Sequence, residues 1–351
     1  MSYTNGLDNP ELYFQTKLYS GSGGNSHAIT FDGSENMQPD WVWIKARNSN
    51  SHRLTDSVRG ATKILYSDLN FAEVTDADTI QSFDTDGFTI DDDADTNGSG
   101  INFASWNWKA GGSASSNSDG SITSSVSANT TAGFSIGTYN GSGSDNTVGH
   151  GLGVAPDMII VKCKSTAHDW VVYHSALGNA KILTLNATTA AQNANGWQYT
   201  SPSSTVFSID NAANSLNQSG QSFVFYAFAE KKGYSKFGSF TGNASTDGPF
   251  LHTGFKPAYF LIKNTSDGSA NWQVWDNKRE YAFNEVQAHL YPNTSGAEVI
   301  NTGYNNWDFL SNGIKVTEDN GDFNGSGNTV IWMAFAESPF VNSNGVPNNA
   351  R

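Results

Sequence analysis

Short runs of apolar residues alternate along the whole chain with turns that are rich in Gly, Asn, Ser and Thr. No segment shows the sustained 3.6-residue periodicity of an amphipathic helix. Several runs instead alternate apolar and polar residues with a period of two, which is typical of half-buried strands. The pattern therefore predicts an all-β chain.

One apolar run occurs three times, each time entered through Pro and ended by Lys. The copies are Pro39–Lys45, Pro156–Lys162 and Pro257–Lys263. A short continuous apolar run with these boundaries predicts a strand that is buried on both faces. Pro at the strand entry costs no ladder hydrogen bond.

A second pattern follows each copy of the first, at Asn97–Gly100, Asn217–Gly220 and Asn324–Gly327. Asn and Gly suit the positive φ of a tight turn. The strand after each turn is apolar on one face in all three copies, which predicts antiparallel strands packing on a core. The residues of that face are Ala104, Trp106, Trp108; Val224, Tyr226, Phe228; and Ile331, Met333, Phe335.

The repeated unit is about a hundred residues long, which is the size of a domain and not of a solenoid repeat. We expect an N-terminal tail or arm at 1–12, a Gly/Ser linker at 111–118, and three repeats. Repeat 1 covers 13–110, repeat 2 covers 119–230 and repeat 3 covers 231–351. Many short strands divided by tight turns predict three tandem antiparallel β-sandwiches of jelly-roll-like form.

Composition narrows the function classes. The 351 residues carry a formal net charge of −14, which argues against binding to nucleic acid or to an anionic membrane. The single cysteine, Cys163, permits no internal disulfide, and its place after an apolar run predicts a buried, inert thiol. We find no signal peptide and no apolar run long enough to span a membrane.

Candidate chemistry is sparse. Asp91, Asp93 and Asp95 have the first three spacings of a calcium loop, but Thr96 and Asn102 stand where that loop has Gly and Glu. We expect a solvated loop, with an irregular calcium loop as the alternative. Neither a zinc pattern nor a nucleophile elbow is present, and we find no acidic or His residue repeated in one column of the units. We therefore expect no enzyme, no metal and no cofactor.

Aromatic residues outside the repeated columns are the candidate interface. We expect them on irregular loops, exposed for a protein partner or for stacking on a sugar. These residues are Trp197, Tyr199, Tyr281, Phe283, Tyr304 and Trp307.

Nearly the whole chain, about 15–351, resembles a repeat module of structural proteins in marine tailed phages, including cyanophages. The runs that carry the resemblance are Trp41–Lys45, Asp56–Lys63, Ser82–Phe88, Ser121–Ile136, His150–Lys162, Phe237–Phe250 and Ala334–Phe340. The resemblance implies a virion protein of the tail fibre or appendage type, with no catalytic residues to transfer. The chain lacks the collagen-like, coiled-coil or glycine-repeat shaft of a typical long fibre. We find no long N-terminal anchor before the modules, so attachment is expected through residues 1–15 or through a module surface.

The leading hypothesis is a tail-associated appendage or fibre-like adhesin, folded in the host cytoplasm and released at lysis. The alternatives are a capsid-decorating protein and a carbohydrate-active enzyme or lectin. Expected partners are other virion proteins of the tail or capsid, further copies of the chain in a homo-oligomer such as a trimer, and a host surface glycan.

Overall fold

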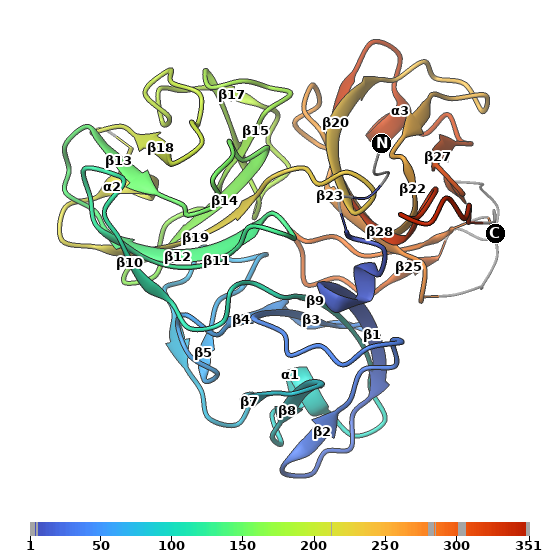
Figure 1. Cartoon of the computed structure of the whole chain (residues 1–351), viewed down its shortest axis with the longest axis horizontal. Coiled ribbons are helices and arrows are strands. Elements are labelled where there is room, and N and C mark those ends of the chain that lie inside the picture. The colour runs from blue at the N-terminus through green and yellow to red at the C-terminus, as the bar shows by residue number, and fades with distance from the viewer. Residues whose placement is uncertain are drawn as a thin grey trace.

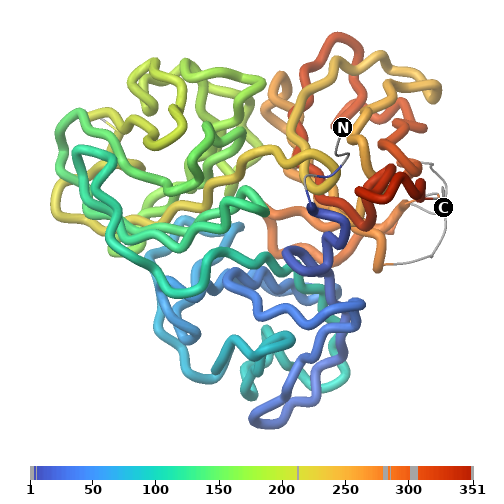
Figure 2. Tube along the Cα trace, viewed as in Figure 1, coloured from blue at the N-terminus to red at the C-terminus, as the bar shows by residue number. Residues whose placement is uncertain are grey.

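The computed structural model describes residues 4, 6–211, 213–279, 284, 286–300 and 307–348. Strands take up 43% of the chain and helices 5%, which confirms the all-β prediction. The chain forms three lobes around a common centre (Figure 1). From residue 13 onward it completes each lobe before it enters the next, while the N-terminal end lies beside the third lobe (Figure 2).

Repeat 1 contains a four-stranded sheet of order β1-β9-β3-β4, a three-stranded sheet β2-β8-β7 and the pair β5-β6. The strands are β1 (Phe14–Ser20), β2 (His27–Ile29), β3 (Trp41–Ala46), β4 (Arg53–Asp56), β5 (Lys63–Ile64), β6 (Val74–Thr75), β7 (Ile80–Asp84), β8 (Gly87–Ile90) and β9 (Asn102–Trp108). A 3-10 helix, η1 (Pro10–Leu12), precedes β1, and the one-turn helix α1 (Ala94–Asn97) precedes β9.

Repeat 2 contains an eight-stranded sheet of order β10-β11-β12-β19-β14-β15-β16-β17 and the pair β13-β18. Its strands are β10 (Ser115–Asn117), β11 (Ser124–Asn129), β12 (Phe134–Asn140), β13 (Asn146–Gly149), β14 (Met158–Cys163), β15 (Val171–His174), β16 (Lys181–Thr184), β17 (Gln192–Asn193), β18 (Val206–Ile209) and β19 (Ser222–Phe228). The helix α2 (Asn214–Asn217) precedes β19.

Repeat 3 contains a four-stranded sheet of order β20-β28-β22-β23, a three-stranded sheet β21-β27-β26 and the pair β24-β25. Its strands are β20 (Ser235–Thr241), β21 (Phe250–His252), β22 (Phe255–Asn264), β23 (Trp272–Asp276), β24 (Ala288–His289), β25 (Val299–Ile300), β26 (Trp307–Leu310), β27 (Gly313–Val316) and β28 (Thr329–Pro339). The helix α3 (Gly321–Asn324) precedes β28.

The main sheets of the three repeats share one strand order and one register. The order β1-β9-β3-β4 corresponds to β12-β19-β14-β15 and to β20-β28-β22-β23. The repeated apolar run forms β3, β14 and most of β22, and its residues are buried as predicted. The repeated columns pair identically: Trp41 with Trp108, Met158 with Phe228, and Tyr259 with Phe335.

Each main sheet buries its outer face against the smaller sheet of the same repeat. Separate hydrophobic clusters result in repeats 1, 2 and 3, and each cluster takes residues from both sheets. Cys163 is buried in the cluster of repeat 2, which confirms the predicted burial of its thiol.

The inner faces of the three main sheets meet in a single central core, which the repeat pattern alone does not predict. One hydrophobic cluster contains residues from all three repeats. At its centre lie three side chains from the same repeated column, namely Trp108, Phe228 and Phe335. Their ring centroids are 6.4 Å apart for Trp108 and Phe228, 5.7 Å for Trp108 and Phe335, and 6.0 Å for Phe228 and Phe335. The chain therefore has a pseudo-threefold axis through this point.

The Asn-led turns differ from the prediction. Gly100, Gly220 and Gly327 adopt φ values of 73°, 75° and 77°, as expected for a tight turn. The Asn residues instead end the short helices α1, α2 and α3, and their buried amides tie three backbone segments together. The amide of Asn97, for example, accepts from the Ser22 N–H at 2.8 Å and donates to the carbonyls of Gly24 and Asp91. Asn217 and Asn324 make the matching bonds in their own repeats.

The expected arm and linker are both part of the fold. Within the described part of 1–12, Leu7 is buried in the central core and the Asp8 carboxylate accepts from the Ser343 N–H at 2.8 Å. Residues Ser115–Asn117 of the expected linker form β10, which extends the sheet of repeat 2 through β11. Over the described part of the chain, no helix has the length and apolarity that a membrane span requires.

Candidate functional site

Of the six aromatic residues predicted to form an interface, two are buried, one is exposed and three lie outside the described residues. Trp197 is 1% exposed and Trp307 is 0% exposed, so the prediction that they are surface residues is wrong. Both fill the space between the two sheets of their repeat, where Trp197 packs edge-on against Tyr173 and Trp307 against Phe260. Tyr281, Phe283 and Tyr304 lie outside the described residues.

Tyr199 is the remaining member of the set and is 61% exposed. Its φ is 48° and that of the preceding Gln198 is 53°, a left-handed conformation that costs energy for residues other than Gly. The side-chain amide of Gln198 holds this turn by donating to the carbonyl of Asn146 at 3.2 Å. The turn presents one large aromatic ring to solvent.

The polar residues that recur between repeats lie where one repeat contacts the next. Trp170 donates its indole N–H to the Tyr66 carbonyl of repeat 1 at 2.7 Å, and Trp272 donates to the Thr184 carbonyl of repeat 2 at 2.9 Å. His52 occupies the same column in repeat 1 and lies 3.0 Å from the Tyr291 carbonyl of repeat 3. These three bonds close a ring from repeat to repeat.

The protonation of His52 follows from its neighbours. Trp43 donates to Nδ1 of His52 at 2.8 Å, so the ring proton lies on Nε2, which donates to the Tyr291 carbonyl. Burial, reinforced by the Lys45 ammonium, lowers the pKa of His52 well below its usual value. The neutral imidazole of His52 therefore donates the junction hydrogen bond in repeat 1 that an indole donates in repeats 2 and 3.

A second set of backbone bonds repeats around the same ring. The N–H of Glu73 donates to the Lys164 carbonyl at 2.7 Å, that of Ala191 to the Thr265 carbonyl at 2.9 Å, and that of Glu298 to the Arg47 carbonyl at 2.8 Å. Each bond joins the position eight residues after the repeated Leu of one repeat to the position two residues after the repeated Lys of the next. The arrangement is head-to-tail and closed, like a cyclic trimer formed within one chain.

Two of the three junctions contain a buried charge network. In repeat 1, the Asp56 carboxylate pairs with Arg59 at 2.5 Å and accepts from the Tyr226 hydroxyl of repeat 2 at 2.7 Å. In repeat 3, Asp276 pairs with Arg279 at 2.6 Å and accepts from the Trp106 indole of repeat 1 at 2.9 Å. This shared acidic column corrects the expectation that no acidic residue recurs in one column, and the spacing Asp-x-x-Arg in two repeats is the sequence signal for it.

The third junction replaces the charged residues with uncharged ones. Asp56 and Asp276 correspond to His174 in repeat 2, and the two Arg residues correspond to Leu177, which packs on the central core. His174 donates from Nε2 to the Trp332 carbonyl of repeat 3 at 3.1 Å, and burial lowers its pKa to about 4. The residue of repeat 3 in the column of Tyr226 and Trp106 is Met333, which has no strong hydrogen-bonding group to match a carboxylate.

The Lys that ends each repeated apolar run is buried inside the strand instead of marking its boundary. Lys45, Lys162 and Lys263 are each 0% exposed. Each ammonium donates to the carbonyl of the following residue, at 2.8, 2.7 and 2.5 Å respectively. Burial lowers the pKa of each of the three ammonium groups to about 8.

These lysines predict a pH dependence of stability. Between pH about 8 and about 10.5 the unfolded chain holds protons that the folded chain has released, so stability rises with pH over this range. Lys162→Met removes one such group, and we expect it to gain stability relative to wild type at pH 7, on the order of 2 kcal/mol, with most of the gain lost by pH 10. Urea denaturation of both proteins at the two pH values measures this. Equal differences at both pH values would contradict the prediction.

The Asp91–Asp95 segment has protein partners. Asp91 accepts from the Ser26 N–H at 3.1 Å, Asp93 caps α1 by accepting from the Asp95 N–H at 2.9 Å, and Asp95 pairs with Arg53. Within the described ranges, no three His, Cys, Asp or Glu side chains are arranged to hold a metal ion. The segment thus has a structural explanation in helix capping and ion pairing.

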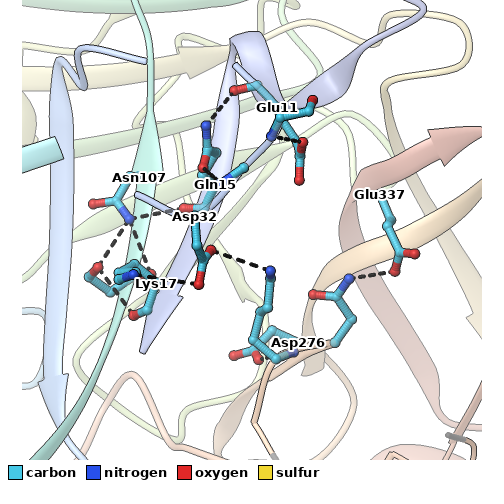
Figure 3. Close-up of polar contacts among 12 residues, drawn as sticks. Glu11, Gln15, Lys17, Asp32, Asn107, Asp276 and Glu337 are labelled. Carbon is cyan, nitrogen blue, oxygen red and sulfur yellow. Dashed lines mark hydrogen bonds and ion pairs between the residues drawn. The ribbon is translucent and has the colours of Figure 1, made fainter. Parts of the chain in front are cut away.

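The outer rim of the junction between repeats 1 and 3 is polar (Figure 3). Asp32 lies 3.5 Å from the Lys17 ammonium of repeat 1 and 3.4 Å from the Lys278 ammonium of repeat 3. Asn107 donates to the Gln15 carbonyl at 2.9 Å beneath this rim. Such half-exposed pairs contribute little stability, so the buried networks and the apolar core hold the junction.

Comparison with known proteins places the chain in a family. A family model described as a domain of unknown function, DUF7483, matches residues 9–339. The chain belongs to this family. The DUF7483 match runs through all three repeats, as the closed ring of contacts between them does. No curated protein and no solved structure matches the chain.

Proposed function

We propose that the protein is a structural component of a tailed-phage particle, a tail-associated appendage or fibre-like adhesin that acts through its surface. It folds in the host cytoplasm and leaves the cell at lysis. Its partners are other virion proteins of the tail or capsid, further copies of itself, and a glycan of the host surface.

One observation carries the proposal beyond the sequence resemblance. The polar residues that recur between repeats are used inside the body, in junction hydrogen bonds, buried ion pairs and turn-tying amides. A catalytic array would instead direct recurring acids or bases into accessible clefts. Because the recurring polar residues join the repeats to one another, they support a rigid scaffold that acts through its outer surface.

We further propose that each repeat is a jelly-roll-like β-sandwich and that the three sandwiches act as one rigid body. The paired sheets with an apolar cluster between them support the sandwich. The shared core supports the rigid body, because separating the repeats would expose large aromatic side chains to water.

The pseudo-threefold arrangement favours a second candidate, a capsid-decorating protein. A body with three similar faces around one axis can occupy a threefold position of a capsid as a single copy. An adhesin at the tail has no such need. The location of the protein on the particle, tail or capsid, distinguishes the two candidates.

Purified particles test the proposal. Mass spectrometry should find the protein in them, and labelled-antibody microscopy should place it on the tail. Label distributed over the capsid would favour decoration instead. If the protein is abundant in infected cells and absent from particles, the structural proposal fails and a carbohydrate-active enzyme becomes the leading explanation.

Tyr199 gives this proposal a residue-level prediction. Tyr199→Ala should change the free energy of unfolding by no more than about 0.5 kcal/mol, because the ring is exposed. An aromatic contact at the centre of an interface contributes about 2 kcal/mol or more, so binding of the purified protein to host cells should weaken at least about tenfold. Phe71→Ala, which removes a 54% exposed ring in repeat 1, is the control. Unchanged cell binding would exclude Tyr199 from the interface.

A further inference from the structure

A pocket in repeat 2 is lined by residues whose counterparts in repeat 1 are three larger side chains that contact one another through Arg53. In repeat 1, the Arg53 guanidinium lies 4.6 Å from the centre of the Tyr66 ring and pairs with the Asp95 carboxylate. These three side chains fill the end of the repeat between β4 and α1. Register pairing places Val171, Thr184 and Ser215 at the corresponding positions of repeat 2.

All three of these smaller residues line one cavity of about 400 Å³. Its size lies within the range of about 300–1,000 Å³ that is typical of small-molecule sites. The cavity therefore results from three substitutions between repeats, Arg to Val, Tyr to Thr and Asp to Ser, that each remove side-chain volume from the same place. Repeat 1 provides an internal comparison in which larger side chains stand at these three positions.

The walls of the cavity are rich in hydrogen-bond acceptors. Asp169 and Asp210 line it, and its lining residues include no Lys, Arg or His. The Asp210 side chain is 6% exposed and accepts from the side-chain N–H of Asn195. The other atom of that amide, Asn195 Oδ1, is buried and has no hydrogen-bond partner in the structure. A buried acceptor without a donor is costly, so a ligand with donor groups would be favoured here.

The floor of the cavity is aliphatic, formed by Val171, Ile182 and Leu216. We infer that this pocket binds a neutral sugar residue of a glycan. Sugar hydroxyls would donate to the two carboxylates and to Asn195, as charge-assisted and neutral hydrogen bonds, while the C–H face of the ring would rest on the floor. An anionic sugar is disfavoured by the two carboxylates. As a host-glycan site, the pocket rests on the proposed function at the particle surface.

The filled state of repeat 1 suggests the test variant. Thr184→Tyr places in the pocket the residue that both other repeats carry at this position, Tyr66 and Tyr291. The Thr184 carbonyl that accepts from Trp272 belongs to the backbone and is retained. Thr131→Tyr, at an exposed turn of the same repeat, is the matched control. Ser215→Arg at the α2 rim is a second blocking variant if Thr184→Tyr does not fold.

Saturation-transfer NMR and calorimetric titration of the intact chain would use methyl glycosides of glucose, galactose, mannose and N-acetylglucosamine, with glucuronate as the anionic comparison. We expect wild type and Thr131→Tyr to bind at least one neutral glycoside, and the blocking variant to bind it at least tenfold more weakly. Absence of binding by every neutral glycoside, equal binding by the blocking variant, or preference for glucuronate would each overturn the site. Because the titrations use the purified protein, failure of the sugar site can be distinguished from failure of the proposed function, which the search for the protein in particles tests.

Discussion

Alanine in place of Phe228 should lower the free energy of unfolding of the whole chain by about 3–5 kcal/mol. The ring is 1% exposed and lies at the pseudo-threefold axis, stacked on Phe134 with centroids 4.7 Å apart and close to Trp108 and Phe335. Its removal leaves a cavity where three repeats meet. Urea denaturation followed by tryptophan fluorescence measures the loss.

The matched control is again Phe71→Ala, which deletes an exposed ring of the same size and should change stability by no more than about 0.5 kcal/mol. A loss below about 1 kcal/mol for Phe228→Ala would mean that the centre is loosely packed. The same experiment on Trp108 and Phe335 should give losses of similar size, because the column occupies equivalent places in each repeat.

Arg279→Leu should cost about 3–5 kcal/mol, because it leaves the carboxylate of Asp276 buried without its cation. Both side chains are 0% exposed, and Arg279 also lies 3.1 Å from the Glu298 carboxylate. Burial alone would raise the pKa of Asp276, but Arg279 and the surrounding donors outweigh burial and lower it. The stabilisation is therefore present above pH about 4 and is lost as the pH falls below the unfolded value.

Repeat 2 supplies the control for this variant. Its residues at the three network positions are His174, Leu177 and Ala191, which join the same junction without buried charges. The triple variant Asp276→His, Arg279→Leu, Glu298→Ala should therefore lose less stability than Arg279→Leu alone, since it removes the buried charges together. Losses that simply add from one substitution to the next would show that the network does not act as a unit.

The sequence predicted the strands well and their assembly poorly. Local patterns suffice for β3, β14 and β22, because a Pro-led apolar run specifies a buried strand within a few residues. The shared core depends on the inner faces of all three sheets being apolar. Their sequence pattern is the same as that of a face buried inside a single sandwich. Nothing in the order of residues distinguishes a face that packs within a repeat from one that packs between repeats.

The exposed interface residues were only partly predictable, because local sequence patterns do not show which segments pack against each other. The sequence pattern places Trp197 and Trp307 in irregular segments, which favours exposure. In the structure Trp307 begins β26, and both indoles are buried between the two sheets of their repeat. The pocket of repeat 2 left a trace in the sequence as a change from Arg53 to Val171 in an otherwise repeated strand. The change from Arg to Val indicates a pocket only once the structure shows that Tyr66 and Asp95 lie beside Arg53.

Differential scanning calorimetry of the intact chain tests the central claim, that the three repeats form one closed body, most directly. A shared core predicts a single transition whose calorimetric enthalpy equals its van't Hoff enthalpy, in spite of the chain length of 351 residues. Phe228→Ala should shift this transition as a whole to lower temperature. Two or three separate transitions, with only one of them moved by Phe228→Ala, would contradict the claim.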